Sequence, residues 1–144
     1  MATVRHILQT KGNAIWSVTP DTSVYDALQM MAEKNVGALL VMSGVKLSGI
    51  FSERDYARKI ILKGESSQTT AVKDVMTSMV VFVHPDQSIE ECMALMTQKR
   101  VRHLPVFDHE RLVGLISIGD VVKEIISDQQ QTIQHLENYI TGKR

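Results

Sequence analysis

The chain has 144 residues, of which 44% are hydrophobic and 22% charged, a composition typical of a soluble, folded protein. Basic and acidic side chains balance at 16 each, so the formal net charge is zero and a nucleic-acid partner is not expected. The single cysteine excludes an intrachain disulfide. Because no apolar run has the length of a signal-peptide core or a membrane span, we expect a cytoplasmic protein without a membrane partner.

An internal repeat is the main feature of the sequence. Residues 18–60 align without a gap with residues 83–125, and about a third of the aligned positions are identical. A shorter lead-in, residues 4–8, echoes residues 72–76 at a slightly larger offset. The first copy therefore carries about three extra residues, which we place near 11–13. This pattern predicts two copies of one supersecondary unit.

In chain order, each copy predicts a strand, a helix, a β-hairpin and a second helix. The first strand is expected at 15–18, and its counterpart at 80–83. Ser23 and Ser88 are each followed three residues later by an acidic residue, which is a capping box at the start of a helix. A second helix is expected after each Ser-x-x-Asp turn. The expected hairpins pair Leu39–Met42 with Leu47–Phe51 and His103–Phe107 with Leu112–Ser117.

Each β-α-β-β-α unit is too small to bury both faces of its sheet alone. We therefore expect an α+β fold in which the two repeats pack as a pseudo-two-fold pair. The expected division is a first domain at 1–66, a second at 67–128 and a helical extension at 129–144, with the polar segment 64–70 as a hinge.

Two motifs recur in both copies and carry a family resemblance. They are Val-x-Pro-Asp-x-Ser (18–23 and 83–88) and Gly-hydrophobic-hydrophobic-Ser-x-x-Asp (49–55 and 114–120), with Leu-Pro-Val at 104–106 in the second copy. This succession resembles the CBS domain, named after cystathionine β-synthase. Asp74-Val-Met76-Thr77 resembles that family's usual lead-in, whereas the first copy departs from it with His6-Ile7-Leu8-Gln9.

The resemblance covers roughly residues 1–128 and implies a paired module with two clefts. Such modules commonly bind AMP, ATP, NAD(H) or S-adenosylmethionine derivatives, form homodimers, and regulate an enzyme or channel. Since no such domain is attached here, we expect regulation in trans.

The chemistry of the Ser-x-x-Asp turns is compatible with a nucleotide. Asp55 and Asp120 would repel phosphate, but a carboxylate can accept hydrogen bonds from both ribose hydroxyls. Ser52 and Ser117 begin helices, whose first amides attract anions. The alternative is that each Ser-x-x-Asp is a capping box that needs no ligand.

The candidate phosphate-binding cations differ between the copies. The first has Arg54, with Arg58 one helical turn further on and Lys59 beside it. A cation at a helix start opposes the helix dipole, which favours an anion ligand for Arg54. The second copy has Gly119 there, and its cations are Arg102 and His103, for which an ordinary exposed strand edge is the alternative. We expect Arg54, Arg102 and His103 to converge on one polyphosphate, in clefts that are not equivalent.

An adenine slot also needs apolar walls, for which the candidates are Ile15, Ala38, Val80 and Pro105.

No other catalytic or metal motif emerges from the sequence. None of the five histidines is paired at metal-ligand spacing on a helix, and Cys92 lies on an apolar helix face. We therefore expect neither an enzyme nor a metal protein.

Beyond residue 128 a stripe of apolar residues continues the last helix and predicts a homodimer contact. The sequence thus predicts an adenine-nucleotide-sensing regulatory module acting on an unknown partner protein, the alternative being a ligand-free interaction scaffold.

Overall fold

The computed structural model describes residues 2–141 and divides into two compact units. Unit 2 is the continuous segment 15–80. Unit 1 combines the described residues up to 14 with those from 81 onwards. The lead-ins are therefore exchanged: the lead-in at residues 4–8 belongs to the same unit as the second repeat, and the lead-in at residues 72–76 belongs to the same unit as the first repeat.

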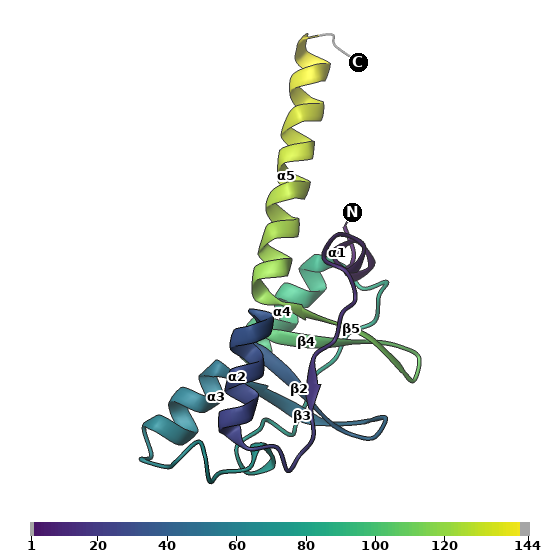
Figure 1. Cartoon of the computed structure of the whole chain (residues 1–144). Helices are drawn as coiled ribbons and strands as arrows, with labels where there is room; N and C mark the ends of the chain where they lie inside the picture. Colours follow the sequence, from purple (N-terminus) through teal and green to yellow (C-terminus); the bar gives the residue numbers. More distant parts are fainter. Residues whose placement is uncertain (1, 142–144) are drawn as a thin grey trace. The chain divides into compact units, whose positions relative to one another are not determined.

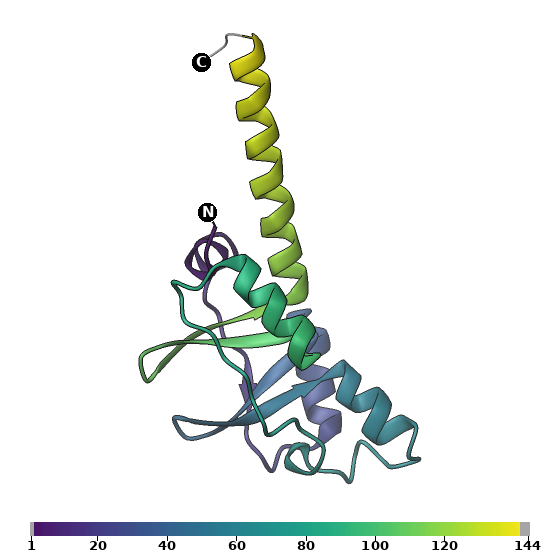
Figure 2. The ribbon, with the colours of Figure 1, turned by 180° about the vertical axis from the view of Figure 1, so that it is seen from behind.

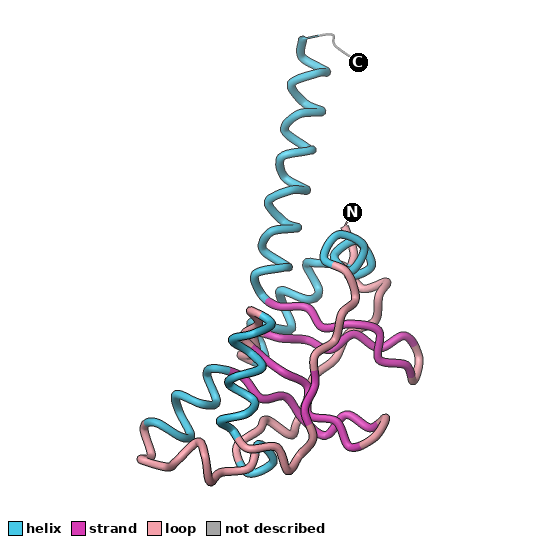
Figure 3. The backbone as a smooth tube through the Cα atoms, in the orientation of Figure 1, coloured by secondary structure: helices cyan, strands magenta, loops and turns pink. Residues whose placement is uncertain are grey.

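Unit 2 is a small sheet with helices (Figure 1). Strand β1 (Ser17–Val18) runs parallel to β2 (Ala38–Ser43), which is antiparallel to β3 (Lys46–Ser52). Between β1 and β2 lies α2 (Val24–Lys34). After β3, helix α3 (Glu53–Tyr56) continues as one π-helical stretch, η1 (Ala57–Ile61), and the unit ends with the short 3-10 helix η2 (Val72–Asp74). Figure 3 shows the connection from η1 towards the next long helix mainly as loop.

Unit 1 repeats this plan without a counterpart of β1, and its lead-in helix and its last helix are longer than those of unit 2. It contains α1 (Val4–Lys11), α4 (Ile89–Lys99), the antiparallel hairpin β4 (His103–Asp108) and β5 (Arg111–Ser117), and α5 (Ile118–Thr141). The first turns of α5 pack on α4 and α1, and the rest of α5 extends beyond the unit (Figures 1 and 2). No helix within residues 2–141 combines the length and apolarity needed to cross a membrane. The expected fold class, α+β with two repeats that each combine a short sheet with helices, is confirmed.

The strand expected at 80–83 is wrong, because only Val83 pairs there, in a single bridge to Val106. In the first copy, the amide of Leu40 donates a hydrogen bond to the carbonyl of Trp16 at 3.2 Å. Pro105 occupies the position equivalent to Leu40 and has no amide hydrogen to donate. The ladder therefore shortens to the hydrogen bonds on either side of Val83.

The predicted helix starts are confirmed. Ser23 Oγ accepts the amide of Asp26, and Ser88 Oγ accepts the amide of Glu91, each at 3.1 Å. These bonds satisfy amides that the first helical turn leaves without a partner.

Each lead-in completes the apolar core of the other repeat. In unit 1, Thr3 bridges Ser88, and Val4 and Ile7 of α1 are buried against the residues of α4 and the hairpin. In unit 2, Ala71 bridges Ser23, and the Val72 side chain is buried in that unit's core. The two exchanges are equivalent because Ser23 and Ser88 are equivalent positions of the repeat.

A glycine in each hairpin permits this close approach. A Cβ on Gly49 would lie 2.7 Å from the carbonyl oxygen of Thr77, and one on Gly114 would lie 2.6 Å from a methyl group of Leu8. The first obstacle is backbone, whereas the second is the end of a flexible side chain. A Cβ on Gly119 would meet only Ser117 Oγ, at 3.6 Å.

We predict that Gly49→Ala lowers the free energy of unfolding by about 1–3 kcal/mol, since the Thr77 backbone must move. Gly114→Ala should cost less, because Leu8 can change rotamer. Gly119→Ala, the matched control, should be neutral or stabilise by up to about 1 kcal/mol. Urea unfolding of the three variants measures this order, and a Gly49→Ala variant as stable as Gly119→Ala would contradict the proposed close contact.

Candidate functional site

The first Ser-x-x-Asp turn, in unit 2, holds a carboxylate with no free acceptor site. Asp55 is 8% exposed. Its Oδ2 accepts hydrogen bonds from the amide and hydroxyl of Ser52, at 3.0 and 3.1 Å. Its Oδ1 accepts the hydroxyl of Thr77 at 3.3 Å and lies 3.2 Å from Lys59 Nζ. A carboxylate has about four lone-pair sites, so this one is filled by the protein itself.

The second turn, in unit 1, holds its carboxylate differently. Asp120 Oδ2 accepts the amide of Ser117 at 2.8 Å and Lys11 Nζ at 2.7 Å. Lys11 also donates to the carbonyl of Leu115 at 2.8 Å. The hydrogen bonds from Lys11 and from the Ser117 amide thus fall on the same oxygen, Oδ2. The carboxylate lies at the N-terminus of the 24-residue helix α5.

The ionisation of Asp120 follows from these contacts. Burial alone raises the pKa of the carboxyl, but the hydrogen bonds from Lys11 and from the Ser117 amide outweigh it. The pKa of Asp120 is therefore lowered from its ordinary value, and at neutral pH the group is a carboxylate that can only accept hydrogen bonds.

Comparison with known proteins identifies the repeat. The family model for the CBS domain matches residues 4–62 and again residues 72–127. The chain belongs to the CBS-domain proteins. The two CBS repeats correspond to the two copies found in the sequence, and the expected family is confirmed.

The chain is similar along most of its length to other CBS-domain proteins. CBSX3, a mitochondrial CBS domain-containing protein of Arabidopsis thaliana, is 40% identical over 97% of this chain and 72% of its own. The solved structure of a CBS-domain protein of Burkholderia ambifaria with a proposed role in signal transduction is 53% identical, with a TM-score of 0.85, covering 89% of this chain and 96% of that one. A third structure, the CBS domain pair of MJ0100 in complex with 5'-methylthioadenosine and S-adenosylmethionine, is 21% identical and shares the fold, with a TM-score of 0.78, over 89% and 98% of the two chains.

In the second CBS repeat, the structure brings most of the predicted site residues together. The amide of Ile118 donates to the carbonyl of Arg102 at 2.8 Å, and His103 lies opposite Ser117 in the hairpin register. Arg102 is exposed. The start of β4 and the start of α5 therefore lie side by side, with a basic side chain next to the Ser-x-x-Asp turn.

The predicted cations of the first repeat lie on α3 and η1. Arg54 is half-buried and Arg58 exposed, and neither makes an ion pair or side-chain hydrogen bond with any residue from 2 to 141. Because Arg54 belongs to unit 2 and Arg102 and His103 to unit 1, their convergence on one polyphosphate stays a prediction.

The predicted apolar walls differ in exposure. Ala38 and Pro105 are buried within their hairpins, whereas Ile15 and Val80 are half-buried at the two ends of unit 2. Ala38 lies opposite Ser52 in the register, beside its turn. The role of all four as an adenine slot stays a prediction.

Lys11 and Thr77 were not among the predicted site residues. Each lies shortly after a lead-in and is separated in sequence from its aspartate, by 109 residues for Lys11 and 22 for Thr77, so periodicity could not pair them. The only sequence signal was this position: Thr77 follows Met76 directly, and the extra residues of the first copy begin near Lys11.

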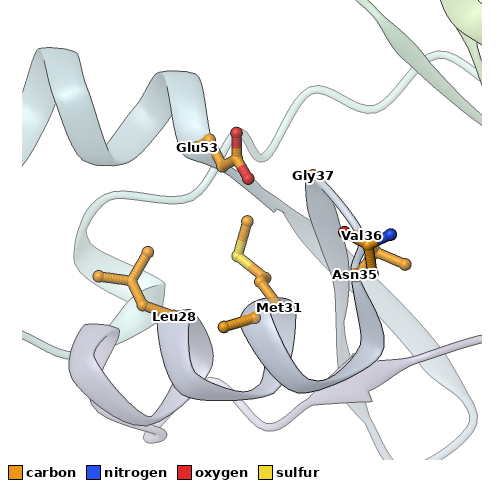
Figure 4. Close-up of a pocket in the computed structure, with 7 residues that line it drawn as sticks. Leu28, Met31, Asn35, Val36, Gly37 and Glu53 are labelled. Carbon is orange, nitrogen blue, oxygen red and sulfur yellow. The ribbon is translucent and has the colours of Figure 1, made fainter.

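A pocket of about 420 Å³ lies beside the first turn (Figure 4). Leu28 and Met31 of α2 and Glu53 of α3 face it, and Gly37 closes one end. None of its lining residues is a predicted site residue, although Gly37 and Glu53 adjoin Ala38 and Ser52. The Glu53 carboxylate makes this pocket unfavourable for a phosphate.

We predict that Lys11→Met raises the pKa of Asp120, because the variant removes the strongest donor that stabilises the charged form. A carboxyl whose folded-state pKa is lowered stabilises the fold above its unfolded-state value, about 3.9, and loses that stability as the pH falls through the folded-state pKa. The stability difference between the parent and Lys11→Met should therefore be full at pH 7 and shrink on acidification.

Carboxyl ¹³C NMR titration of Asp120 measures the pKa shift, and urea unfolding at several pH values measures the stability difference. Lys73→Met, which removes a fully exposed pair with Asp21, is the matched control and should leave the titration of Asp120 unchanged. An unchanged pKa of Asp120 in Lys11→Met would refute the contact.

Proposed function

We propose that this CBS pair is a regulatory module that senses an adenine nucleotide, with its ribose bound at the Asp120 turn, and acts in trans on a partner protein. The observation that carries the proposal is the uneven hydrogen bonding of Asp120: Lys11 and the Ser117 amide both donate to Oδ2, and we propose that Oδ1 accepts the ribose hydroxyls. The amides at the start of α5, Lys11 and Arg102 provide positive charge close to the same turn.

Support also comes from the family. The MJ0100 CBS pair, which shares this fold, is known in complex with two adenosine-containing ligands. AMP, ATP, NAD(H) and S-adenosylmethionine derivatives are the ligands that the CBS resemblance implies, and we propose that this chain takes a phosphorylated member of that group. We propose the cytoplasm as its location.

The two turns would then have different roles. Since the four acceptor positions of Asp55 are filled by Ser52, Thr77 and Lys59, a ribose there would have to displace a protein donor. We propose that Asp55 is structural and Asp120 binds ligand. This refines the expectation of two inequivalent clefts.

The second candidate function is a ligand-free interaction scaffold. It is favoured by the capping-box geometry of both turns, in which Ser52 and Asp55, like Ser117 and Asp120, satisfy each other's backbone amides. In that case Asp120, like Asp55, would only cap the helix that follows it.

We predict that Asp120→Ala weakens nucleotide binding at least about tenfold, because each hydrogen bond to a charged acceptor contributes about 1.5–3 kcal/mol. Asp55→Ala is the matched control: it removes the same capping carboxylate and should lower stability while leaving the affinity nearly unchanged. The ligand is first chosen by a thermal-shift screen of AMP, ADP, ATP, NAD, NADH and S-adenosylmethionine. Binding at a hundredfold excess over Kd should stabilise the fold by about 2.7 kcal/mol.

Calorimetry then compares the two variants below their unfolding temperatures. Equal affinity in the parent and Asp120→Ala would refute the ribose role. No thermal shift with any of the six compounds would favour the scaffold.

We also propose that the chain is a homodimer through α5. Beyond residue 128 nearly every side chain of this helix is exposed, including Ile133, Leu136 and Ile140 on one face. These side chains continue the stripe of Val122 and Ile126. An apolar stripe at three-four spacing is what a second copy of the same helix buries in a helix pair.

We predict that Ile133→Glu with Leu136→Glu converts the dimer to a monomer, because two charges would be buried in the contact. Gln131→Glu with His135→Glu puts two charges on the opposite face and should leave the dimer intact. Light scattering coupled to gel filtration gives the mass. A monomeric parent protein, or two variants of equal mass, would count against the proposed contact.

A further inference from the structure

Three potential metal ligands meet at the tip of the second hairpin, away from the Ser-x-x-Asp turn. They are His84, Asp108 and His109, and one donor atom from each lies within 4.8 Å of the others. Asp108 Oδ1 is 3.4 Å from Nε2 of His84 and 3.9 Å from Nε2 of His109. All three side chains are accessible to solvent, with exposed fractions of 39%, 41% and 91%.

Tertiary structure brings these residues together. The parallel bridge between Val83 and Val106 lays the segment before α4 alongside β4, so that His84 reaches the end of that strand. His109 follows Asp108 directly in the turn between β4 and β5. The histidines are far apart in sequence and not on a helix, which is why their spacing carried no metal signal.

The spacing of the donor atoms fits a small transition-metal ion. Tetrahedral zinc holds nitrogen and oxygen ligands at about 2.0–2.2 Å, so neighbouring ligand atoms lie about 3.3–3.5 Å apart. The distance between His84 and Asp108 already has this value, and the largely exposed His109 ring would have to move closer to both. Two imidazoles and one carboxylate form a ligand set that zinc commonly takes, with a fourth position open to water.

A second carboxylate stands behind His84. Asp86 Oδ2 lies 3.6 Å from His84 Nδ1, while Asp86 Oδ1 pairs with Arg5 at 2.9 Å. Without metal, the amide of Asp86 donates to Nδ1 at 3.1 Å, which leaves the ring proton on Nε2, facing Asp108. Metal at Nε2 would require the other tautomer, with the proton on Nδ1. The ring would then give up the hydrogen bond from the Asp86 amide and turn slightly to donate to Asp86 Oδ2 instead. A carboxylate behind a metal-bound histidine is a common arrangement that orients the ring.

The first repeat shows that the fold does not require these side chains. Its equivalent positions are Thr19, Ser43 and Gly44, and its hairpin has the same register. Gly44 has φ of +64°, and His109 adopts nearly the same left-handed backbone, φ +59°. Glycine takes this conformation without steric cost, whereas histidine does not. The second repeat therefore has a histidine in a left-handed backbone conformation that glycine would adopt more readily.

We propose that His84, Asp108 and His109 bind one divalent transition-metal ion of the zinc class, with water completing its coordination. The bound ion would link the tip of the β4–β5 hairpin, through Asp108 and His109, to the segment before α4, through His84. This site is independent of the proposed nucleotide site, since it shares no residue with it.

The test uses the full chain without a histidine tag, stripped of metal with a chelator and dialysed. Zn²⁺ calorimetry should give one ion per chain, and Co²⁺ should give visible absorption bands of a four-coordinate site. Loss of a residue that only hydrogen-bonds to a metal ligand typically lowers metal affinity 10–100-fold. His84→Ala and His109→Gly remove the proposed ligands themselves, so each should weaken zinc binding by at least about tenfold. His109→Gly copies the turn of the first repeat and should raise the thermal stability of the metal-free chain, which shows that its loss of binding is not misfolding.

His135→Ala is the matched control, because it removes an exposed histidine from α5 and should bind zinc as the parent does. Absence of zinc binding by the parent at micromolar concentration would overturn the proposal. So would equal binding by His109→Gly and the parent, or an equal loss in His135→Ala. Each of these outcomes is distinct from the nucleotide experiments, in which no metal is added.

Discussion

The exchange of lead-ins is the constraint on which the rest of the structure depends. A hairpin with one or two helices cannot bury both faces of its sheet, so each repeat needs a further apolar segment. Unit 1 takes that segment from the start of the chain, through Val4 and Ile7, and unit 2 takes it from the region that follows the first repeat, through Val72 and Val75. The close approach needs hairpin glycines without a Cβ, and Gly49 and Gly114 provide them. Neither unit is therefore built from one repeat alone.

The same exchange determines the chemistry of the two Ser-x-x-Asp turns. The motif is identical in both copies, and both carboxylates cap the helix that follows. Their remaining contacts differ. Thr77, just after the second lead-in, and Lys59 of η1 contact the second oxygen of Asp55, whereas Lys11 donates to the oxygen of Asp120 that also caps the helix. The two carboxylates therefore have different partners on their oxygens, which is the physical basis for proposing different roles for them.

The repeats diverge most where packing constrains them least. Buried positions such as Leu39 and Leu104 are conserved between the copies because the core has the same shape in both. At the hairpin tips, the exposed Gly44 of one copy corresponds to His109 of the other. Likewise Gly37 corresponds to Arg102 beside the second turn. The proposed nucleotide turn and the proposed metal site thus both lie in the second repeat, while the first repeat lacks the equivalents of Arg102, His84, Asp108 and His109.

The sequence by itself determined the repeat, the family, the hairpins and the helix starts, because these depend on local spacing: alternating apolar residues, Ser followed by an acid three positions later, and turn residues between strands. It also contained the reason for the short strand at Val83, since Pro105 has no amide to donate, although the pattern of apolar residues at 80–83 predicted a longer one. Tertiary structure decided which lead-in meets which hairpin, which lysine meets which carboxylate, and that His84 lies beside Asp108. These are contacts between segments many residues apart, whose pairing depends on how buried surfaces fit together and leaves no periodic trace in the chain.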